Sequence, residues 1–332
     1  MGSLTTCCLV FLIAVLSLAI FTSMLVIPVA LWHPQTFQSR VNALLTHLEY
    51  SAQDEDVHWG YGILQKLKEL IPKDWGKKYS DCDMSLQSPI NIIPANAINN
   101  TLLEPMEYLN YEARPWGDIW TVTNNGHTVQ FSASFTDPPQ LTRGGLVPGR
   151  YDFRQFHFHW GSNDTQGSEH TVDGRQYPLE VHLIHIKSTV DPSPYKIAAL
   201  GVLFELSDSD SNEAAEQEPE VLAQMAALGR AAKTVLPAGT SREISLPGFS
   251  LSQFVPADER FFRYYGSLTT PPCSQFLQWT VMAKPLPVTR QVLEMFRQLL
   301  KGGHGHASER LLDNFRPYQP MTGRVINYFG GW

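Results

Sequence analysis

The pattern of hydrophobic and polar residues changes along the chain. Residues 7–32 are apolar almost throughout, and the first charged side chain is Arg40. A membrane-spanning helix needs about 20 apolar residues, so this run is long enough to form one. From residue 88 onward, short apolar runs are separated by Gly, Pro, Asn and Asp, which is typical of antiparallel strands joined by long loops. Helical spacing of apolar residues occurs at 63–71, 220–235 and 289–300.

This pattern divides the chain into four segments. We expect residues 1–32 to form a signal anchor, or a signal peptide if the segment is cleaved. The anchor is favoured because the apolar run exceeds a typical signal-peptide core and is not preceded by Lys or Arg. Residues 33–56 are predicted to be a stalk or linker with an apolar stripe, which packs on the main domain or pairs with a second copy; the protein is then a monomer or a stalk-mediated dimer. Residues 57–328 form one folded domain, and 329–332 a short tail.

Composition narrows the partners and the compartment. With 332 residues, 43% of them hydrophobic, the chain can bury a large core. The net charge of -7 and the lack of a Lys/Arg-rich block argue against nucleic acid as a partner. Cys82 and Cys273 lie outside the apolar segment; they either form a disulfide, which requires an oxidising compartment, or remain reduced buried thiols. Asn99 and Asn163 begin sequons and are glycosylation candidates in a lumenal or extracellular domain.

The run Gln-Phe-His-Phe-His-Trp at 155–160 is the strongest chemical signal. In an extended strand His157 and His159 lie on one face, and the three aromatic residues lie on the other. Two imidazoles on one face of a strand suit a metal site. A lone His-x-His pair is more often a strand with two satisfied polar side chains, so a metal site also requires a third ligand.

The run 179–185 can supply that third ligand. Glu180 and His182 share one face of the predicted strand, and His185 has the opposite parity. Catalytic zinc takes three protein ligands and leaves one position open, so His182 would complete the set. Gln155 and Glu180 share the faces of the three histidines and can accept the hydrogen bonds that fix the imidazole tautomers.

Two further patterns indicate how such a site would handle protons. A Thr269 hydroxyl that donates to a buried Glu169 must accept a hydrogen bond from its other neighbour, so it could orient a nucleophile. His127 follows an Asn-Gly turn, and a histidine with a pKa of about 6.5 can carry protons to buffer. Alone, each feature is more often ordinary, as a turn cap or an exposed turn residue. His127 would be functional only at the rim of the metal cavity.

Together these motifs resemble those of the α-class carbonic anhydrases, over residues 58–327. The matching runs are His-Trp-Gly-Tyr at 58–61, Gln-Ser-Pro-Ile-Asn-Ile at 87–92, Asn-Gly-His at 125–127, the run at 155–160, Gly-Ser-Glu-His-Thr-Val-Asp-Gly at 167–174, 180–185, Gly-Ser-Leu-Thr-Thr-Pro-Pro at 266–272, and Asp-Asn-Phe-Arg-Pro at 313–317. The resemblance implies an α+β, mainly β single domain, with short peripheral helices around a central, mostly antiparallel twisted sheet of about ten strands.

The resemblance also implies a role for each residue that matches a family motif. The zinc ligands would be His157, His159 and His182, hydrogen-bonded from behind by Gln155 and Glu180. Thr269 would orient the reactive oxygen, Glu169 would accept from Thr269, and His127 would be the proton shuttle. The residues that would order water towards the shuttle are Tyr61, Asn125 and Gln130. The residues that would line the substrate pocket are Ile184, Ala199, Leu268, Thr270, Leu277 and Trp279. Cys82 and Cys273 match the disulfide of secreted and membrane-bound members.

The implied function is reversible hydration of CO2 to bicarbonate and a proton, by attack of hydroxide held on a Zn2+ cofactor. The domain would lie on the lumenal or extracellular side of a membrane, tethered by the N-terminal segment, or be secreted after cleavage. The alternative is a catalytically silent carbonic anhydrase-like binding or matrix domain. Such members typically lack a zinc histidine, whereas this chain has all three. Ester hydrolysis could use the same centre, but a narrow apolar pocket argues against bulky esters.

Overall fold

The computed structural model describes residues 58–62, 69–189, 192–207, 219–302 and 309–331. All of them belong to one compact unit, residues 54–332. No helix within these ranges is long and apolar enough to cross a membrane. The predicted N-terminal segment at 1–32 and the predicted stalk at 33–56 lie outside the described residues.

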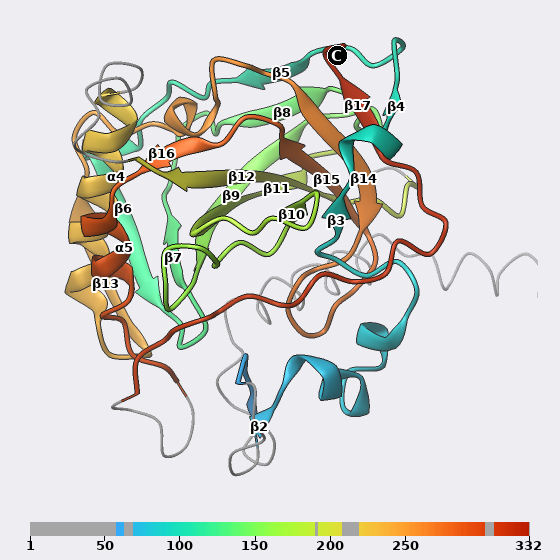
Figure 1. Ribbon diagram of the computed structural model, residues 1–332. Coiled ribbons are helices and arrows are strands. Elements are labelled where there is room, and N and C mark those ends of the chain that lie inside the picture. Colours follow the sequence, from blue (N-terminus) through green and yellow to red (C-terminus); the bar gives the residue numbers. More distant parts are fainter. Residues whose placement is uncertain (1–57, 63–68, 190–191, 208–218, 303–308, 332) are drawn as a thin grey trace, which may run out of the picture. The chain divides into compact units, whose positions relative to one another are not determined.

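A thirteen-stranded mixed sheet forms the centre of this unit (Figure 1). Ten strands follow one another in the order β13-β6-β7-β9-β11-β12-β15-β14-β17-β4, while β5 and β16 pair beside this path and β8 joins β5 to β9. Most neighbours are antiparallel; β12 runs parallel to β15 and β16, and β17 runs parallel to β4. The expected mainly β fold around a mostly antiparallel sheet is therefore confirmed.

The strands of this sheet have the following bounds: β4 Ile98–Asn99, β5 Met106–Leu109, β6 Ile119–Asn124, β7 Val129–Ser132, β8 Gln140–Arg143, β9 Tyr151–Trp160, β11 Leu179–Lys187, β12 Ile197–Leu206, β13 Thr240–Ser245, β14 Phe261–Gly266, β15 Leu277–Met282, β16 Leu286–Val288 and β17 Asn327–Phe329. Two small parallel pairs lie outside it, namely β1 (His58–Trp59) with β2 (Glu69–Leu70), and β3 (Asn91–Ile92) with β10 (Thr171–Val172).

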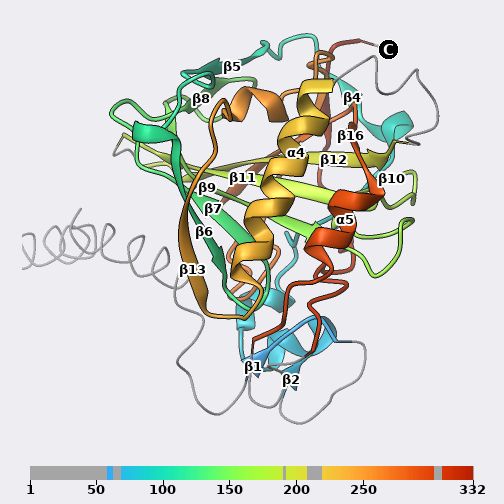
Figure 2. The same cartoon turned by 90° about the vertical axis from the view of Figure 1, so that its left-hand side faces the viewer.

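Two α-helices, α4 (Pro219–Ala232) and α5 (Arg290–Phe296), lie side by side over one face of the sheet (Figure 2). The side chain of Thr289 caps α5 by accepting from the backbone N–H of Val292. The helix expected at 63–71 is wrong at its C-terminal end. Glu69 and Leu70 form β2 because their backbone pairs with His58 and Trp59, and residues 63–68 lie outside the described ranges.

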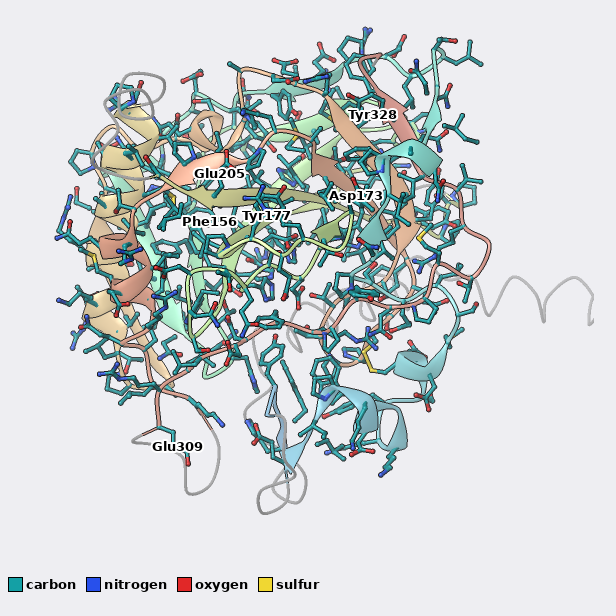
Figure 3. The ribbon with its side chains drawn as sticks, viewed as in Figure 1. Phe156, Asp173, Tyr177, Glu205, Glu309 and Tyr328 are labelled. Atoms are coloured by element: carbon teal, nitrogen blue, oxygen red, sulfur yellow. A yellow bond between two sulfur atoms is a disulfide. The ribbon has the colours of Figure 1, made fainter. Side chains whose placement is uncertain are left out.

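The aromatic face of β9 packs into the core beneath these helices. Phe156, Phe158 and Trp160 are fully buried, and Figure 3 labels Phe156 within this layer. The ring of Phe158 lies 4.9 Å from the ring of Phe296 on α5. The predicted alternation along β9 is confirmed, and it leaves the histidines on the opposite face of the sheet.

A disulfide joins Cys82 to Cys273, with the two Cα atoms 4.8 Å apart. It links residues 191 positions apart in the sequence. Both cysteines are buried against Trp59 and Trp75 in a small apolar cluster. Of the two alternatives drawn from the sequence, the disulfide is the one that the structure contains.

Candidate metal centre

Strand register brings the predicted ligands together on one face of the sheet. His157 on β9 lies directly opposite His182 on β11, and Gln130 on β7 lies opposite His157. Residues directly opposite each other in a sheet present their side chains on the same face. His159 shares that face because it is two residues from His157. Three imidazoles from two adjacent central strands therefore converge.

The next row of cross-strand neighbours is mostly apolar. Gln155 on β9 lies opposite Ile184, Ile184 lies opposite Ala199, and Ala199 lies opposite Trp279. The indole ring of Trp279 stands 4.7 Å from the ring of His182. The predicted pocket residues on these strands thus line a buried apolar surface beside the histidines.

The loop after β14 supplies the remaining predicted pocket residues. Trp279 Nε1 donates to the carbonyl of Ser267 at 3.0 Å, which ties this loop to the sheet. Leu268 and Thr269 are buried, and Thr270 is half-buried. Leu277 begins β15 on the same face as Trp279 and is fully buried.

The outward nitrogen of each histidine faces a hydrogen-bond acceptor. His157 Nδ1 lies 2.9 Å from Gln155 Oε1, and His159 Nδ1 lies 2.7 Å from the backbone carbonyl of Asn314. His182 Nε2 lies 2.7 Å from Glu180 Oε1. A carbonyl or carboxylate oxygen only accepts, so each of these nitrogens carries the proton. The other nitrogen of each neutral ring then holds a lone pair.

The inward lone pairs point towards one another. The candidate ligand atoms of His157, His159 and His182 all lie within 4.8 Å of one another, and His159 Nε2 is 3.1 Å from His182 Nδ1. With both outer nitrogens protonated, that short contact has no hydrogen to share. Burial lowers the pKa of all three rings, which keeps them neutral. Three converging imidazole lone pairs fit the donor set of a divalent zinc ion.

Glu180 is held ionised behind this group. Its Oε2 accepts from the backbone N–H groups of Glu169 and His170, each at 2.8 Å, and its Oε1 faces His170 Nδ1 at 2.6 Å as well as His182. Burial acts to raise the pKa of Glu180, but His170 and His182 outweigh it and hold that pKa well below its usual value. Although His170, Glu180 and His182 also cluster closely enough for a metal, both imidazoles already point a nitrogen at the carboxylate. We therefore interpret this cluster as an orienting network.

Glu169 lies on the inner side of the cluster. Its Oε1 accepts from the backbone N–H of Arg316 at 2.8 Å, and its Oε2 is 3.5 Å from His159 Nε2. Burial raises the pKa of Glu169 well above its usual value, while interactions with Arg316 and with the side chain of Thr269 oppose this shift. A cation held by the histidines would lower the same pKa by direct attraction. Glu169 Oε2 has no hydrogen-bond partner among the described residues, so the pairing of Thr269 with Glu169 stays a prediction.

His127 lies among aromatic rings. Its ring stacks on Trp59 with centroids 3.7 Å apart and lies 4.9 Å from the ring of His58. Burial, with smaller effects from His58 and Lys301, lowers the pKa of His127 to about 3. The side-chain oxygen of Asn125 is used by the turn itself, because it accepts from the backbone N–H groups of His127 and Thr128. The predicted water-ordering role of Asn125 is therefore limited to its amide nitrogen.

Tyr61 lies near both the aromatic cluster and Glu169. Its ring packs edge-on against Trp59 and Trp75. Burial, together with the charge of Glu169, raises the pKa of its hydroxyl. Tyr61 therefore stays protonated at neutral pH and can donate a hydrogen bond, as the predicted role in ordering water requires.

Three residues that contribute to the site were given no role in the sequence analysis. Asn314 accepts from His159 through its backbone carbonyl, Arg316 holds Glu169, and His170 connects Glu180 to the Tyr264 hydroxyl at 2.7 Å. His170 follows Glu169 directly, so its position in the motif was a usable signal. Asn314 is 155 residues from His159, and no local pattern predicts that contact.

The other predicted residues lie away from this centre. His185 has the opposite parity, as expected, and meets the Tyr111 hydroxyl at 2.8 Å in the core. A register shift after Ile184 accompanies this change of face. Asn99 and Asn163, the glycosylation candidates, are exposed.

Comparisons with known proteins agree with this geometry. A family model described as eukaryotic-type carbonic anhydrase matches residues 70–329. The chain is 35% identical over 275 residues to carbonic anhydrase 7 of Homo sapiens, which covers 81% of this chain and 96% of that protein. It is 34% identical to carbonic anhydrase 7 of Mus musculus, with the same coverage. It is 37% identical over 242 residues to putative carbonic anhydrase 3 of Caenorhabditis elegans, covering 72% of this chain and 88% of that protein.

Proposed function

The chain belongs to the eukaryotic-type carbonic anhydrase family, and from this premise we propose that it hydrates CO2 with a zinc ion held by His157, His159 and His182. The observation that carries this proposal is the set of three inward lone pairs, each fixed by an acceptor behind its ring. Bound zinc supplies a Lewis acid that lowers the pKa of a water molecule to about 7, so that hydroxide is available at neutral pH.

Thr269 and Glu169 would orient the nucleophile. When the Thr269 hydroxyl donates its proton to the Glu169 carboxylate, its oxygen can only accept from the reactive water. One O–H bond of that water is then directed at Thr269, which leaves a lone pair facing away from Thr269. Arg316 keeps Glu169 in place because its backbone N–H donates to Oε1 at 2.8 Å. Fixing the direction of attack before CO2 arrives removes an entropic part of the barrier.

The apolar row beside the histidines would hold the substrate. Ile184, Ala199 and Trp279 present little to hydrogen-bond, which favours neutral CO2 over charged bicarbonate. Ala199 has the smallest side chain in this row and therefore takes the least space above the sheet. The same surface excludes bulk water from the reacting atoms and disfavours retention of the charged product.

His127 would remove the proton. A proton carrier works best when its pKa lies near the working pH, and burial holds the pKa of His127 at about 3 in its stack on Trp59. We therefore propose that the imidazole takes up the proton in a more exposed orientation, and that the stacked orientation is the deprotonated state. Transfer to buffer would then regenerate the neutral ring.

Substitution of one ligand tests this function. His157→Ala should lose both zinc, measured by elemental analysis, and CO2 hydration, measured by stopped-flow pH change. Arg154→Ala, an exposed position on the same strand, is the matched control and should retain both. Near-normal CO2 hydration by His157→Ala would refute the assignment of the ligands. A wild-type protein that folds but holds no zinc and hydrates no CO2 would instead be a silent binding domain.

We also propose that residues 57–328 act on the lumenal or extracellular side of a membrane, with 1–32 as a tether and 33–56 as a linker. The buried Cys82–Cys273 disulfide supports this location because such bonds persist in oxidising compartments. The mature N-terminus and the partition of the protein between membranes and medium decide between an uncleaved anchor and a cleaved signal.

A further inference from the structure

Strand β4 forms an open edge of the main sheet. Its two residues, Ile98 and Asn99, pair with Asn327 and Tyr328 of β17, and no strand follows β4 in the described part of the sheet. Figure 1 shows β4 at the margin of the sheet, and Figure 3 labels Tyr328 on the neighbouring strand. An open strand edge presents backbone groups to which another chain can pair, so proteins usually protect such edges.

Exposed apolar side chains lie beside this edge and favour its association with another chain. Ile98 is 54% exposed, Leu102 is 90% exposed, and Val325 is 51% exposed. The backbone N–H of Ile98 donates to the carbonyl of Ile326 at 2.9 Å, which places Val325 next to β4. Exposed apolar groups at an unpaired strand edge favour association with another chain.

Asn99 lies between these apolar residues, in the sequence Asn99-Asn100-Thr101. Its side chain is exposed and has no hydrogen-bond partner among the described residues. In the neighbouring Asn100 both side-chain polar atoms are engaged, since its Nδ2 donates to Asn327 Oδ1 and its Oδ1 accepts from the backbone N–H of Leu102, both at 3.0 Å. Asn99, whose amide has no partner among the described residues, is therefore the asparagine that satisfies the Asn-x-Thr pattern.

We propose that Asn99 carries an N-linked glycan that covers the β4 edge and keeps the domain from associating through it. The inference rests on the lumenal or extracellular location proposed above. In the modification, Asn99 Nδ2 forms a bond to the anomeric carbon of an oligosaccharide. The bond from that carbon to a lipid-linked pyrophosphate breaks, the pyrophosphate leaves with the electron pair, and the amide releases one proton. A bulky, solvated glycan there blocks a second strand and shields Ile98 and Leu102.

Asn163 provides an internal comparison. It also begins a sequon and is exposed, but its Oδ1 accepts from both the backbone N–H and the hydroxyl of Thr165, at 2.9 and 2.7 Å. It lies in the loop after β9 and not on a sheet edge. A glycan at Asn163 would report that the domain has reached the glycosylating compartment, with no expected effect on association.

The experiment is expression of the full chain in a secreting mammalian cell, with glycopeptide mass spectrometry before and after enzymatic removal of N-glycans. The expected result is an occupied Asn99. Thr101→Ala should remove that glycan, whereas Thr101→Ser keeps the sequon and should retain it.

A second measurement tests association through the edge. Purified in detergent, Thr101→Ala should form concentration-dependent oligomers in sedimentation velocity, while Thr101→Ser should sediment as the wild type does. Adding Leu102→Asp to Thr101→Ala should restore the wild-type profile. CO2 hydration should be unchanged in every variant.

Three outcomes would overturn the proposal. An unoccupied Asn99 beside an occupied Asn163 would show that the compartment is right and the site is wrong. A Thr101→Ala protein that sediments like the wild type would show that the glycan does not protect the edge. If neither asparagine is modified and Cys82 and Cys273 are free thiols in the cell, the proposed location itself fails, and this inference fails with it.

Discussion

Replacing Glu180 with Gln should weaken zinc binding. The Glu180 carboxylate keeps the proton of His182 on Nε2, and this leaves the lone pair of Nδ1 available to the metal. The Glu180 carboxylate accepts two backbone N–H groups on Oε2 and two imidazole nitrogens on Oε1, at distances from 2.6 to 2.8 Å. A glutamine has one oxygen and one NH2 group, so only one of these two donor pairs can keep an acceptor. If the NH2 group faces His182 Nε2, that nitrogen must accept, and the proton moves to Nδ1, where the metal would bind.

The magnitude follows from the hydrogen bonds that the substitution breaks. Groups that accept the second ring N–H of a metal-binding histidine contribute about 10–100-fold to metal affinity, or about 1.4–2.7 kcal/mol. If the NH2 group instead faces the backbone of Glu169 and His170, two buried donors are orphaned at about 1–3 kcal/mol each, and the metal-free fold loses about 2–6 kcal/mol. The variant should therefore lose zinc affinity, stability of the metal-free protein, or both.

The assay is competition for zinc with a chelator, paired with urea unfolding of the metal-free protein. Gln155→Ala is the matched control, since it removes one neutral acceptor at 2.9 Å from His157 and should weaken zinc binding less. A Glu180→Gln protein with wild-type zinc affinity and wild-type unfolding would refute the tautomer argument.

Three further predictions test other parts of the structure. His127→Ala should lower CO2 turnover by up to about 100-fold in dilute buffer, with zinc content unchanged and activity recovered by added imidazole; loss that imidazole does not rescue would contradict the shuttle role. Cys82→Ser should lower the free energy of unfolding by about 2–5 kcal/mol in denaturant titrations, because it opens the link to Cys273. His185, whose pKa burial lowers to about 3, binds a proton more readily when unfolded, so stability should fall as pH drops from about 6.5 towards 3. In His185→Phe that acid dependence should be smaller, and an unchanged pH profile of stability would argue that other groups cause it.

The alternation of side chains along two strands was readable from the sequence because it depends only on the period of an extended chain. His157 and His159 had to share a face, with Phe156 and Phe158 opposite, whatever the neighbouring strands were. The opposite parity of His185 followed from the same rule, and the structure places it in the core against Tyr111. The mainly β class and the apolar run at 7–32 were likewise properties of local pattern.

The contacts that complete the site depend on the tertiary structure. Whether His182 met His157 or another residue was a question of register, and the sheet decides it. The acceptor for His159 comes from Asn314, 155 residues away, and the donor to Glu169 comes from Arg316. Local sequence carries no signal for such pairs, because they form only when the C-terminal segment packs against β9.

Solvent exposure was also decided by packing. The turn before His127 suggested an exposed histidine, but Trp59 stacks on the ring and burial lowers its pKa to about 3. Conversely, Leu102 is 90% exposed in the turn that follows edge strand β4, although its side chain is apolar. The sequence determined which chemical groups are available and on which face of a strand they lie; the fold determined which of them meet, because burial and long-range contact are set by elements distant in the chain.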